Sequence, residues 1–199
     1  MPEQYSERIV KAFEVAYNAH KGQTRKGTII PYIVHPMDVA SILMKAGVGE
    51  EVVLAGLLHD VVEDTPMTIK EVREMFGEEV ARLVKGVSEP EELAKKPDEQ
   101  KRGNWVERKQ HTIDFIRTAD VKMKILSCAD KLSNIRSMIE DYNIMGEDLW
   151  NRFNAPFEKQ KWYYNSMLLA FESGPETIAN FSIYNEFKMC VERLFGKIQ

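Results

Sequence analysis

The chain has 199 residues, a length that suits one domain with a sizeable core and leaves little room for two. Hydrophobic residues make up 44% of it and charged residues 29%, which argues against a disordered protein. The 27 basic and 31 acidic residues give a net charge of -4, so nothing indicates a nucleic-acid or membrane partner. This net charge is compatible with a local positive pocket for an anionic small molecule. The N-terminus carries charges throughout, and no run approaches the roughly 20 apolar residues of a membrane span. We therefore expect a cytoplasmic protein.

The first third of the chain predicts helices around one basic loop. A helix is expected over 5–20, with an apolar face made by Ile9, Phe13, Ala16 and Tyr17. Glycine and proline then interrupt the pattern, which predicts a short loop or hairpin near 22–35. Because proline suits the first turn of a helix, Pro36 places His35 at a helix entrance.

The remaining periodicity is also helical. Further helices are predicted over 36–46, 51–63, 68–76, 78–86, 105–118, 120–140 and 156–173, with a last helix ending near 195. A polar surface loop is expected over 88–104 and an irregular stretch over 141–154. No set of alternating strands occurs, so we expect an all-α protein that forms a single domain over 1–199. Cys128 and Cys190 lie far apart in apolar helical contexts, and we expect both to be buried, reduced thiols rather than one disulfide.

The stretch LLHDVVEDT, residues 57–65, places four ionisable groups in an otherwise apolar run. Charged residues are rarely buried unless they are paired or hold a metal. On a helix, His59 and Asp60 diverge by about 100°, yet their side chains can converge on one ion between them. An imidazole and a carboxylate suit a divalent transition metal such as manganese, iron or zinc.

Two further ligands are needed, and the sequence offers two candidates. His35 can point inward from its helix entrance, and Asp130 interrupts the apolar stripe of a downstream helix. The competing interpretation is structural: a histidine hydrogen-bonded in the core, and an aspartate that caps a helix or forms a salt bridge. Two helices with a buried acid, together with the adjacent His-Asp pair, favour the metal site.

Four segments carry a resemblance to a known family. They are AHKGQTRKGTIIPYIVHPMDVASIL, AGLLHDVVEDT, FGEEVARLVKGVSE and CADKLSNIRSM, and the resemblance covers roughly 12–140. The chain resembles the HD superfamily of metal-dependent phosphohydrolases, and more narrowly the hydrolase domain of the Rel/SpoT alarmone enzymes and the small stand-alone alarmone hydrolases. This resemblance implies a helical HD domain, with the core motifs in 12–140 and C-terminal helices in 156–195.

The resemblance also implies a role for each matching position. His35, His59, Asp60 and Asp130 match metal ligands, with manganese the usual ion, and Glu63 and Asp64 match the pair that orients and activates the attacking water. The implied substrate contacts are Arg25, Lys26 and Asn134. Lys159 and Tyr163 match a basic residue and a tyrosine that close over the phosphate end of the substrate in similar small hydrolases, although an aromatic core helix explains them equally well.

The implied reaction is metal-dependent hydrolysis of guanosine 3′,5′-bis(diphosphate) and its pentaphosphate relative, releasing pyrophosphate and GDP or GTP. We expect hydrolysis only, since the chain has no space for a synthetase domain. One alternative is a phosphatase of the same fold that acts on another nucleotide, such as NADPH. Another is a regulator that binds the alarmone without cleaving it, but the presence of both Glu63 and Asp64 counts against this. The oligomeric state is left open.

Overall fold

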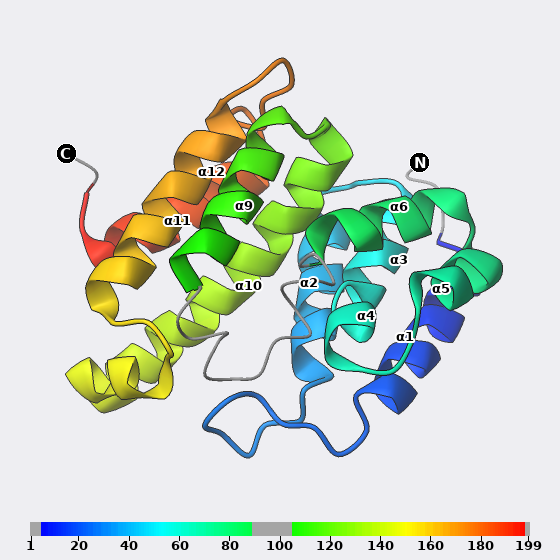
Figure 1. Ribbon diagram of the computed structural model, residues 1–199, viewed down its shortest axis with the longest axis horizontal. Coiled ribbons are helices and arrows are strands. Elements are labelled where there is room, and N and C mark those ends of the chain that lie inside the picture. The colour runs from blue at the N-terminus through cyan, green and yellow to red at the C-terminus, as the bar shows by residue number, and fades with distance from the viewer. Residues whose placement is uncertain (1–4, 89–104, 198–199) are drawn as a thin grey trace. The chain divides into compact units, whose positions relative to one another are not determined.

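The computed structural model describes residues 5–88 and 105–197 (Figure 1). Within these ranges the regular elements are helices, and no strand occurs beyond one isolated antiparallel bridge between Thr24 and Pro31. The predictions of an all-α fold and of a short hairpin-like loop near 22–35 are therefore confirmed. Two compact units, Met1–Ser88 and Glu89–Gln199, divide the chain. The single domain over 1–199 stays a prediction, and most of the loop predicted over 88–104 lies outside the described residues.

The first unit is built around one apolar helix. Its helices are α1 (Arg8–Ala19), α2 (Val34–Lys45), α3 (Glu50–Leu58), α4 (Val61–Asp64), α5 (Ile69–Phe76) and α6 (Glu78–Val87). Every residue of α3 from Val52 to Leu58 is buried, and α1, α2 and α6 all pack against this helix. Thr68 caps α5 through a reciprocal pair of hydrogen bonds with Glu71, which satisfies backbone donors at the helix start.

The buried face of α1 differs from the predicted one. Ala12 and Ala16 are fully buried and His20 just beyond the helix is 3% exposed, whereas Phe13 and Tyr17 are 37% and 48% exposed. These three buried residues are four positions apart, so they share one face. Alanine lets the backbone of α1 approach α3 closely, and this small-residue stripe prevails over the larger aromatic one.

A single helix over 51–63 was also predicted, and this was wrong. The helix is interrupted at His59 and Asp60, so that α3 ends at Leu58 and α4 starts at Val61, although the backbone angles of both residues stay in the helical region. The His59 Nδ1 atom lies 2.8 Å from the carbonyl oxygen of Gly56. In an uninterrupted helix that carbonyl would accept from the amide of Asp60, so the imidazole competes for the acceptor at the point where the helix breaks.

The second unit consists of longer helices. They are α9 (Trp105–Thr118), α10 (Val121–Met145), the 3-10 helix η1 (Gly146–Arg152), α11 (Phe157–Glu172) and α12 (Ser182–Phe195). The side chain of Asp120 caps α10 by accepting from the amide of Met123 at 2.9 Å. This helix runs five residues beyond its predicted end at 140, and most of the stretch predicted to be irregular is helical. Gly146, with φ of 59°, ends α10 because glycine adopts this conformation without a steric penalty.

Lys124 is a fully buried lysine in the second unit. Its Nζ atom donates to the backbone carbonyls of Arg117, Ser173 and Glu176. Arg117 lies in the last turn of α9, and Ser173 directly follows α11, so one ammonium group satisfies carbonyls at the ends of two helices. This lysine therefore has a structural role.

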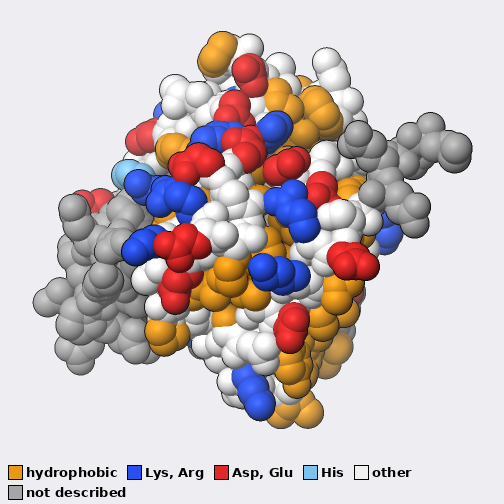
Figure 2. Space-filling view, turned by 90° about the vertical axis from the view of Figure 1, so that its right-hand side faces the viewer, with side chains coloured by type: hydrophobic (Ala, Val, Ile, Leu, Met, Phe, Trp, Pro, Cys, Tyr) orange, Lys and Arg blue, Asp and Glu red, His pale blue; other side chains and the backbone are white. Residues whose placement is uncertain are grey.

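One face of the molecule shows both signs of charge. Figure 2 shows Lys and Arg side chains interspersed with Asp and Glu on one face. Ion pairs on α5 and α6 include Arg73 with Glu78 and Arg82 with Glu79.

No described helix combines the length and apolar character required to span a bilayer. Cys128 and Cys190 are both free thiols, as predicted; Cys128 is buried as expected, whereas Cys190 is only partly buried.

Candidate metal centre

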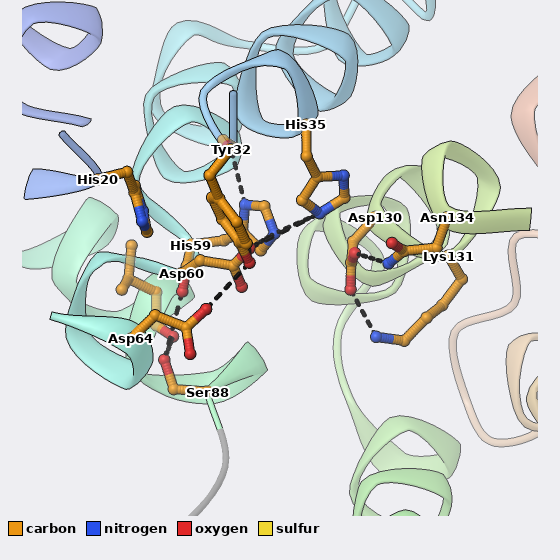
Figure 3. A network of polar contacts seen from close by, with 12 residues as sticks. His20, Tyr32, His35, His59, Asp60, Asp64, Ser88, Asp130, Lys131 and Asn134 are labelled. Carbon is orange, nitrogen blue, oxygen red and sulfur yellow. Dashed lines mark hydrogen bonds and ion pairs between the residues drawn. The ribbon is translucent and has the colours of Figure 1, made fainter. Parts of the chain in front are cut away.

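Two buried histidines of the first unit point their ring nitrogens at each other (Figure 3). His35 lies in the first turn of α2, and His59 directly follows α3. Their Nε2 atoms are 3.2 Å apart, and each residue is 4% exposed. Pro36 is buried beside His35, so the helix entrance predicted from the sequence turns His35 inward.

The tautomer of His59 follows from its neighbour. A carbonyl oxygen can only accept, so the contact between His59 Nδ1 and the Gly56 carbonyl places a hydrogen on Nδ1. In the neutral ring, Nε2 then carries a lone pair that faces His35. A backbone carbonyl that orients an imidazole in this way is typical of metal-binding histidines.

Asp60 brings a carboxylate to the same point. Its Oδ2 atom lies 3.0 Å from His59 Nε2 and 3.7 Å from His35 Nε2. Two ligand atoms that each lie about 2.1 Å from one ion are about 3.0 Å apart at a right angle and about 3.4 Å apart at the tetrahedral angle. The three distances in this structure fall in or close to that range, so His35, His59 and Asp60 fit a divalent metal ion.

Tyr32 connects Asp60 with Asp64. Its hydroxyl lies 2.7 Å from Asp60 Oδ2 and 2.9 Å from Asp64 Oδ2. Burial, followed by the negative charges of the two aspartates, raises the pKa of Tyr32, so the hydroxyl stays a donor. Desolvation of the carboxyl group, followed by the charge of Asp60, raises the pKa of Asp64, although the residue as a whole lies at the surface.

The remaining predicted residues of the first unit lie near its surface. Glu63 is exposed on α4, directly before Asp64. Arg25 is half-buried, and its guanidinium carbon is 5.6 Å from the centre of the Tyr32 ring. Lys26 is exposed at the next position of the loop. Arg25 therefore lies against Tyr32, the residue whose hydroxyl contacts both Asp60 and Asp64.

In the second unit, Asp130 is half-buried on α10. Lys131 Nζ donates to its Oδ2 atom, and Asn134 Nδ2 donates to its Oδ1 atom at 2.6 Å. Burial, the largest single influence, opposes the charged form of Lys131, but the charge and hydrogen bond of Asp130 together with the neighbouring tyrosines raise the pKa of the lysine above its usual value. The three side chains form one polar cluster on one turn of helix (Figure 3).

Lys159 and Tyr163 lie on the same helix but differ in their exposure to solvent. Lys159 is exposed on α11, while Tyr163 is 4% exposed. The Tyr163 ring lies 6.0 Å from the ring of Trp105, with Lys109 Nζ 5.4 Å from its centre. Within the described residues its buried hydroxyl has no hydrogen-bond partner. The aromatic core explains the ring, while the hydroxyl leaves a polar atom for a further partner.

Comparison with known proteins identifies the family. The sequence profile of the HD domain family matches residues 12–154. The chain belongs to the HD domain family. The match takes in the two histidines and Asp60 of the first unit, as well as Asp130 of the second.

Relatives and solved structures of this HD protein agree with the assignment. The bifunctional (p)ppGpp synthase/hydrolase SpoT of Escherichia coli (strain K12) is 36% identical over 138 residues, which are 69% of this chain and 19% of that protein. A guanosine-3′,5′-bis(diphosphate) 3′-pyrophosphohydrolase of Aquifex aeolicus (strain VF5) is 36% identical over 135 residues, 68% of this chain and 18% of that protein. The chain therefore spans about a fifth of the length of these relatives.

Two solved structures match over most of the HD protein. The crystal structure of lmo0812 from Listeria monocytogenes EGD-e has a TM-score of 0.72 at 39% identity, covering 82% of this chain and 99% of that one. The structure of a metazoan orthologue of SpoT that hydrolyses ppGpp has a TM-score of 0.75 at 25% identity, covering 98% and 99%.

Three residues near His35, His59 and Asp60 of the HD protein were not predicted from the sequence as site residues: His20, Gln23 and Tyr32. His20 and Tyr32 stack with ring centres 4.5 Å apart and planes 23° apart. Gln23 Oε1 lies 2.8 Å from His20 Nδ1, and Gln23 Nε2 donates to the carbonyl of Asp64 at 3.1 Å. One sequence signal was available, because His20 continues the buried alanine stripe of α1.

Proposed function

We propose that this HD protein hydrolyses guanosine 3′,5′-bis(diphosphate) and its pentaphosphate relative. Water attacks the phosphorus attached at the 3′ oxygen, and the products are pyrophosphate and GDP or GTP. The observation that carries the proposal is the convergence of His35, His59 and Asp60 in a chain whose HD relatives include 3′-pyrophosphohydrolases. The orthologue of SpoT that hydrolyses ppGpp supports the same substrate.

We further propose Asp130 as the fourth metal ligand, with manganese as the ion, as the family resemblance implies. Iron or zinc would also suit a set of two imidazoles and two carboxylates. A bound divalent ion would lower the pKa of a water molecule and neutralise phosphate charge. Lys131 and Asn134 support this role of Asp130, since donors to a carboxylate fix the orientation of its oxygens.

Glu63 and Asp64 are the proposed catalytic carboxylates. A carboxylate within one turn of the ligands can orient the attacking water and accept its proton. Glu63 is exposed, and Asp64 is held by Tyr32 next to Asp60. Burial raises the pKa of the Asp64 carboxyl, and a carboxylate with a raised pKa is a better proton acceptor at neutral pH than an ordinary aspartate.

The substrate contacts follow from charge and hydrogen-bonding capacity. Arg25 and Lys26, on a loop that contains two glycines, would bind the base and phosphates of the substrate. Asn134 would hold the nucleoside sugar. Lys159 and Tyr163 would contact the phosphate end, where the buried Tyr163 hydroxyl can donate to an oxygen.

The proposed partner is thus a small nucleotide rather than nucleic acid or a membrane, and the proposed compartment is the cytoplasm. The two free thiols, Cys128 and Cys190, are consistent with a reducing compartment. The face shown in Figure 2 mixes both signs of charge, unlike the basic patches that nucleic-acid partners select.

The proposal is tested by a substrate panel. The purified protein is incubated with guanosine 3′,5′-bis(diphosphate), the pentaphosphate, NADPH and GTP, each with and without Mn²⁺, and the products are separated by anion-exchange chromatography. We expect pyrophosphate with GDP or GTP from the alarmones only when metal is present. Phosphate released from NADPH alone would assign a different substrate, and binding of the alarmone without any product would indicate a regulator.

A further inference from the structure

We infer that Tyr32 is a positioning residue that sets the Asp64 carboxylate beside Asp60, and that His20 and Gln23 hold this arrangement in place. The inference rests on the proposed function, in which Asp60 is a metal ligand and Asp64 acts on the attacking water. We call His20, Gln23 and Tyr32 the tyrosine network. All three belong to the first unit, in or beside the loop between α1 and α2.

The Tyr32 hydroxyl contacts two acids but carries one hydrogen. It lies 2.7 Å from Asp60 and 2.9 Å from Asp64, so it can donate to one carboxylate at a time. Asp60 also lies 3.0 Å from His59 Nε2 and belongs to the ligand group, which can balance its charge. The hydroxyl hydrogen is then left for Asp64. Without this hydrogen bond, the Asp64 carboxylate loses the contact that holds it beside Asp60.

The amide of Gln23 fixes the neighbouring proton positions. Its Nε2 atom donates to the carbonyl of Asp64, which can only accept, so its Oε1 atom is the one that faces His20. His20 Nδ1 must therefore carry a hydrogen and donate it to Gln23. One glutamine thus connects the backbone of Asp64 to the histidine that packs on Tyr32.

His20 holds the Tyr32 ring from the side of α1. The two rings stack 4.5 Å apart and nearly parallel, and His20 is buried next to the alanines that pack α1 on α3. The Arg25 guanidinium also lies over the Tyr32 ring. A tyrosine has only two side-chain torsions, so these contacts leave its hydroxyl little freedom to move. A fixed hydroxyl can in turn fix the carboxylate to which it donates.

A purely structural role makes a different prediction. If Tyr32 only anchors the loop, its ring contacts matter and its hydroxyl does not. Tyr32→Phe separates the two roles, because it keeps the ring against His20 and Arg25 and removes only the hydroxyl. The matched control is Tyr17→Phe, since Tyr17 is a half-exposed tyrosine of α1 in the same unit.

The experiment measures kcat, KM, Mn²⁺ affinity by calorimetry and the melting temperature for both variants and the wild type. We expect Tyr32→Phe to lower kcat by on the order of 100-fold, because displacement of a catalytic group by about 1 Å has such an effect. KM and Mn²⁺ affinity should change by less than about threefold. A kcat within about threefold of wild type would overturn the inference, as would a loss of Mn²⁺ affinity that fully accounts for the lost turnover.

A second measurement keeps the inference distinct from the proposed function. If the wild type hydrolyses none of the nucleotides, the proposed function fails, and the tyrosine network is judged from crystal structures of wild type and Tyr32→Phe grown with Mn²⁺. We expect the Asp64 carboxylate to move away from Asp60 by about 1 Å or more in the variant. An unchanged Asp64 would overturn the inference whatever the activity.

Discussion

The Nε2 atoms of His35 and His59 face each other at 3.2 Å inside the first unit. The Gly56 carbonyl places the hydrogen of His59 on Nδ1, so its Nε2 presents a lone pair to the other ring. With the carboxylate of Asp60 at 3.0 Å, this arrangement concentrates electron pairs at one buried point. Such a set of electron-pair donors favours a bound cation at that point.

Metal binding should weaken as the pH falls. A ligand imidazole must be unprotonated at Nε2, so each proton that binds there competes with the metal. Between about pH 8 and about pH 6 the apparent affinity for Mn²⁺ should fall, as calorimetry at several pH values can measure. Proton release upon metal binding, detected in buffers of different ionisation enthalpy, is the accompanying signal. An affinity that does not depend on pH would contradict histidine ligation.

Glu63→Gln should keep the metal and lose most of the turnover. Glu63 is exposed and is not among the proposed ligands, so its loss leaves the donor set intact. Removing a general base costs about 10²–10⁴ in rate. The measurement pairs kcat with metal content by atomic spectroscopy. Unchanged turnover would remove Glu63 from the mechanism.

Asp130→Asn should weaken metal retention. An amide offers a neutral oxygen in place of a charged one, which reduces the attraction to a divalent ion. Metal analysis after gel filtration tests this, and we expect less metal per chain than in the wild type. Asp141→Asn is the matched control, since Asp141 lies on the same helix and pairs with Arg152. Equal metal content in both variants would exclude Asp130 as a ligand.

Lys124→Met should destabilise the protein without changing the metal site. Methionine can fill much of the space of the lysine stem but leaves the carbonyls of Arg117, Ser173 and Glu176 without their donor. The expected loss is about 2–3 kcal/mol in the free energy of unfolding. Urea denaturation measures it, with the exposed Lys122→Met as the control. A loss no larger than that of the control would show that these hydrogen bonds contribute little.

Gly174→Ala tests a close approach in the second unit. A Cβ atom at this position would lie 2.1 Å from the carbonyl oxygen of Arg117, and the backbone has φ of +81°. Gly196 has a similar φ of +83° but open space where a methyl group would lie, so Gly196→Ala isolates the conformational cost. We expect Gly174→Ala to lower the free energy of unfolding by at least about 2 kcal/mol more than Gly196→Ala. Equal effects would show that the backbone around Arg117 relaxes.

Most helix boundaries could be predicted because local residues mark them. Gly77 separates α5 from α6, and Asp120 caps α10, as the sequence indicates. The break at His59 was missed because no glycine or proline stands there, and it depends on a side chain that competes for a backbone acceptor. The predicted buried face of α1 was right for Ala16 but wrong for Phe13 and Tyr17, because hydrophobicity favours an aromatic residue whereas close packing on α3 favours alanine.

The candidate site was predictable to the extent that its chemistry is carried by residue type. The histidines and Asp60 stand out because ionisable groups in apolar runs need partners. No ionisable group in an apolar run marks Tyr32 in this way, because tyrosine occurs both in protein cores and at surfaces. The positioning role inferred for Tyr32 depends on its contacts with Asp60 and Asp64, which are 28 and 32 positions away in the sequence. These residues become neighbours only when α2 packs against α3.

The most direct test is a titration of turnover against bound manganese. Metal-free protein is loaded stepwise with Mn²⁺, and pyrophosphate release from guanosine 3′,5′-bis(diphosphate) is measured at each step. We predict no pyrophosphate release from the metal-free protein and a rise that saturates at about one ion per chain. Full turnover without metal, or saturation with manganese without pyrophosphate release, would contradict this prediction.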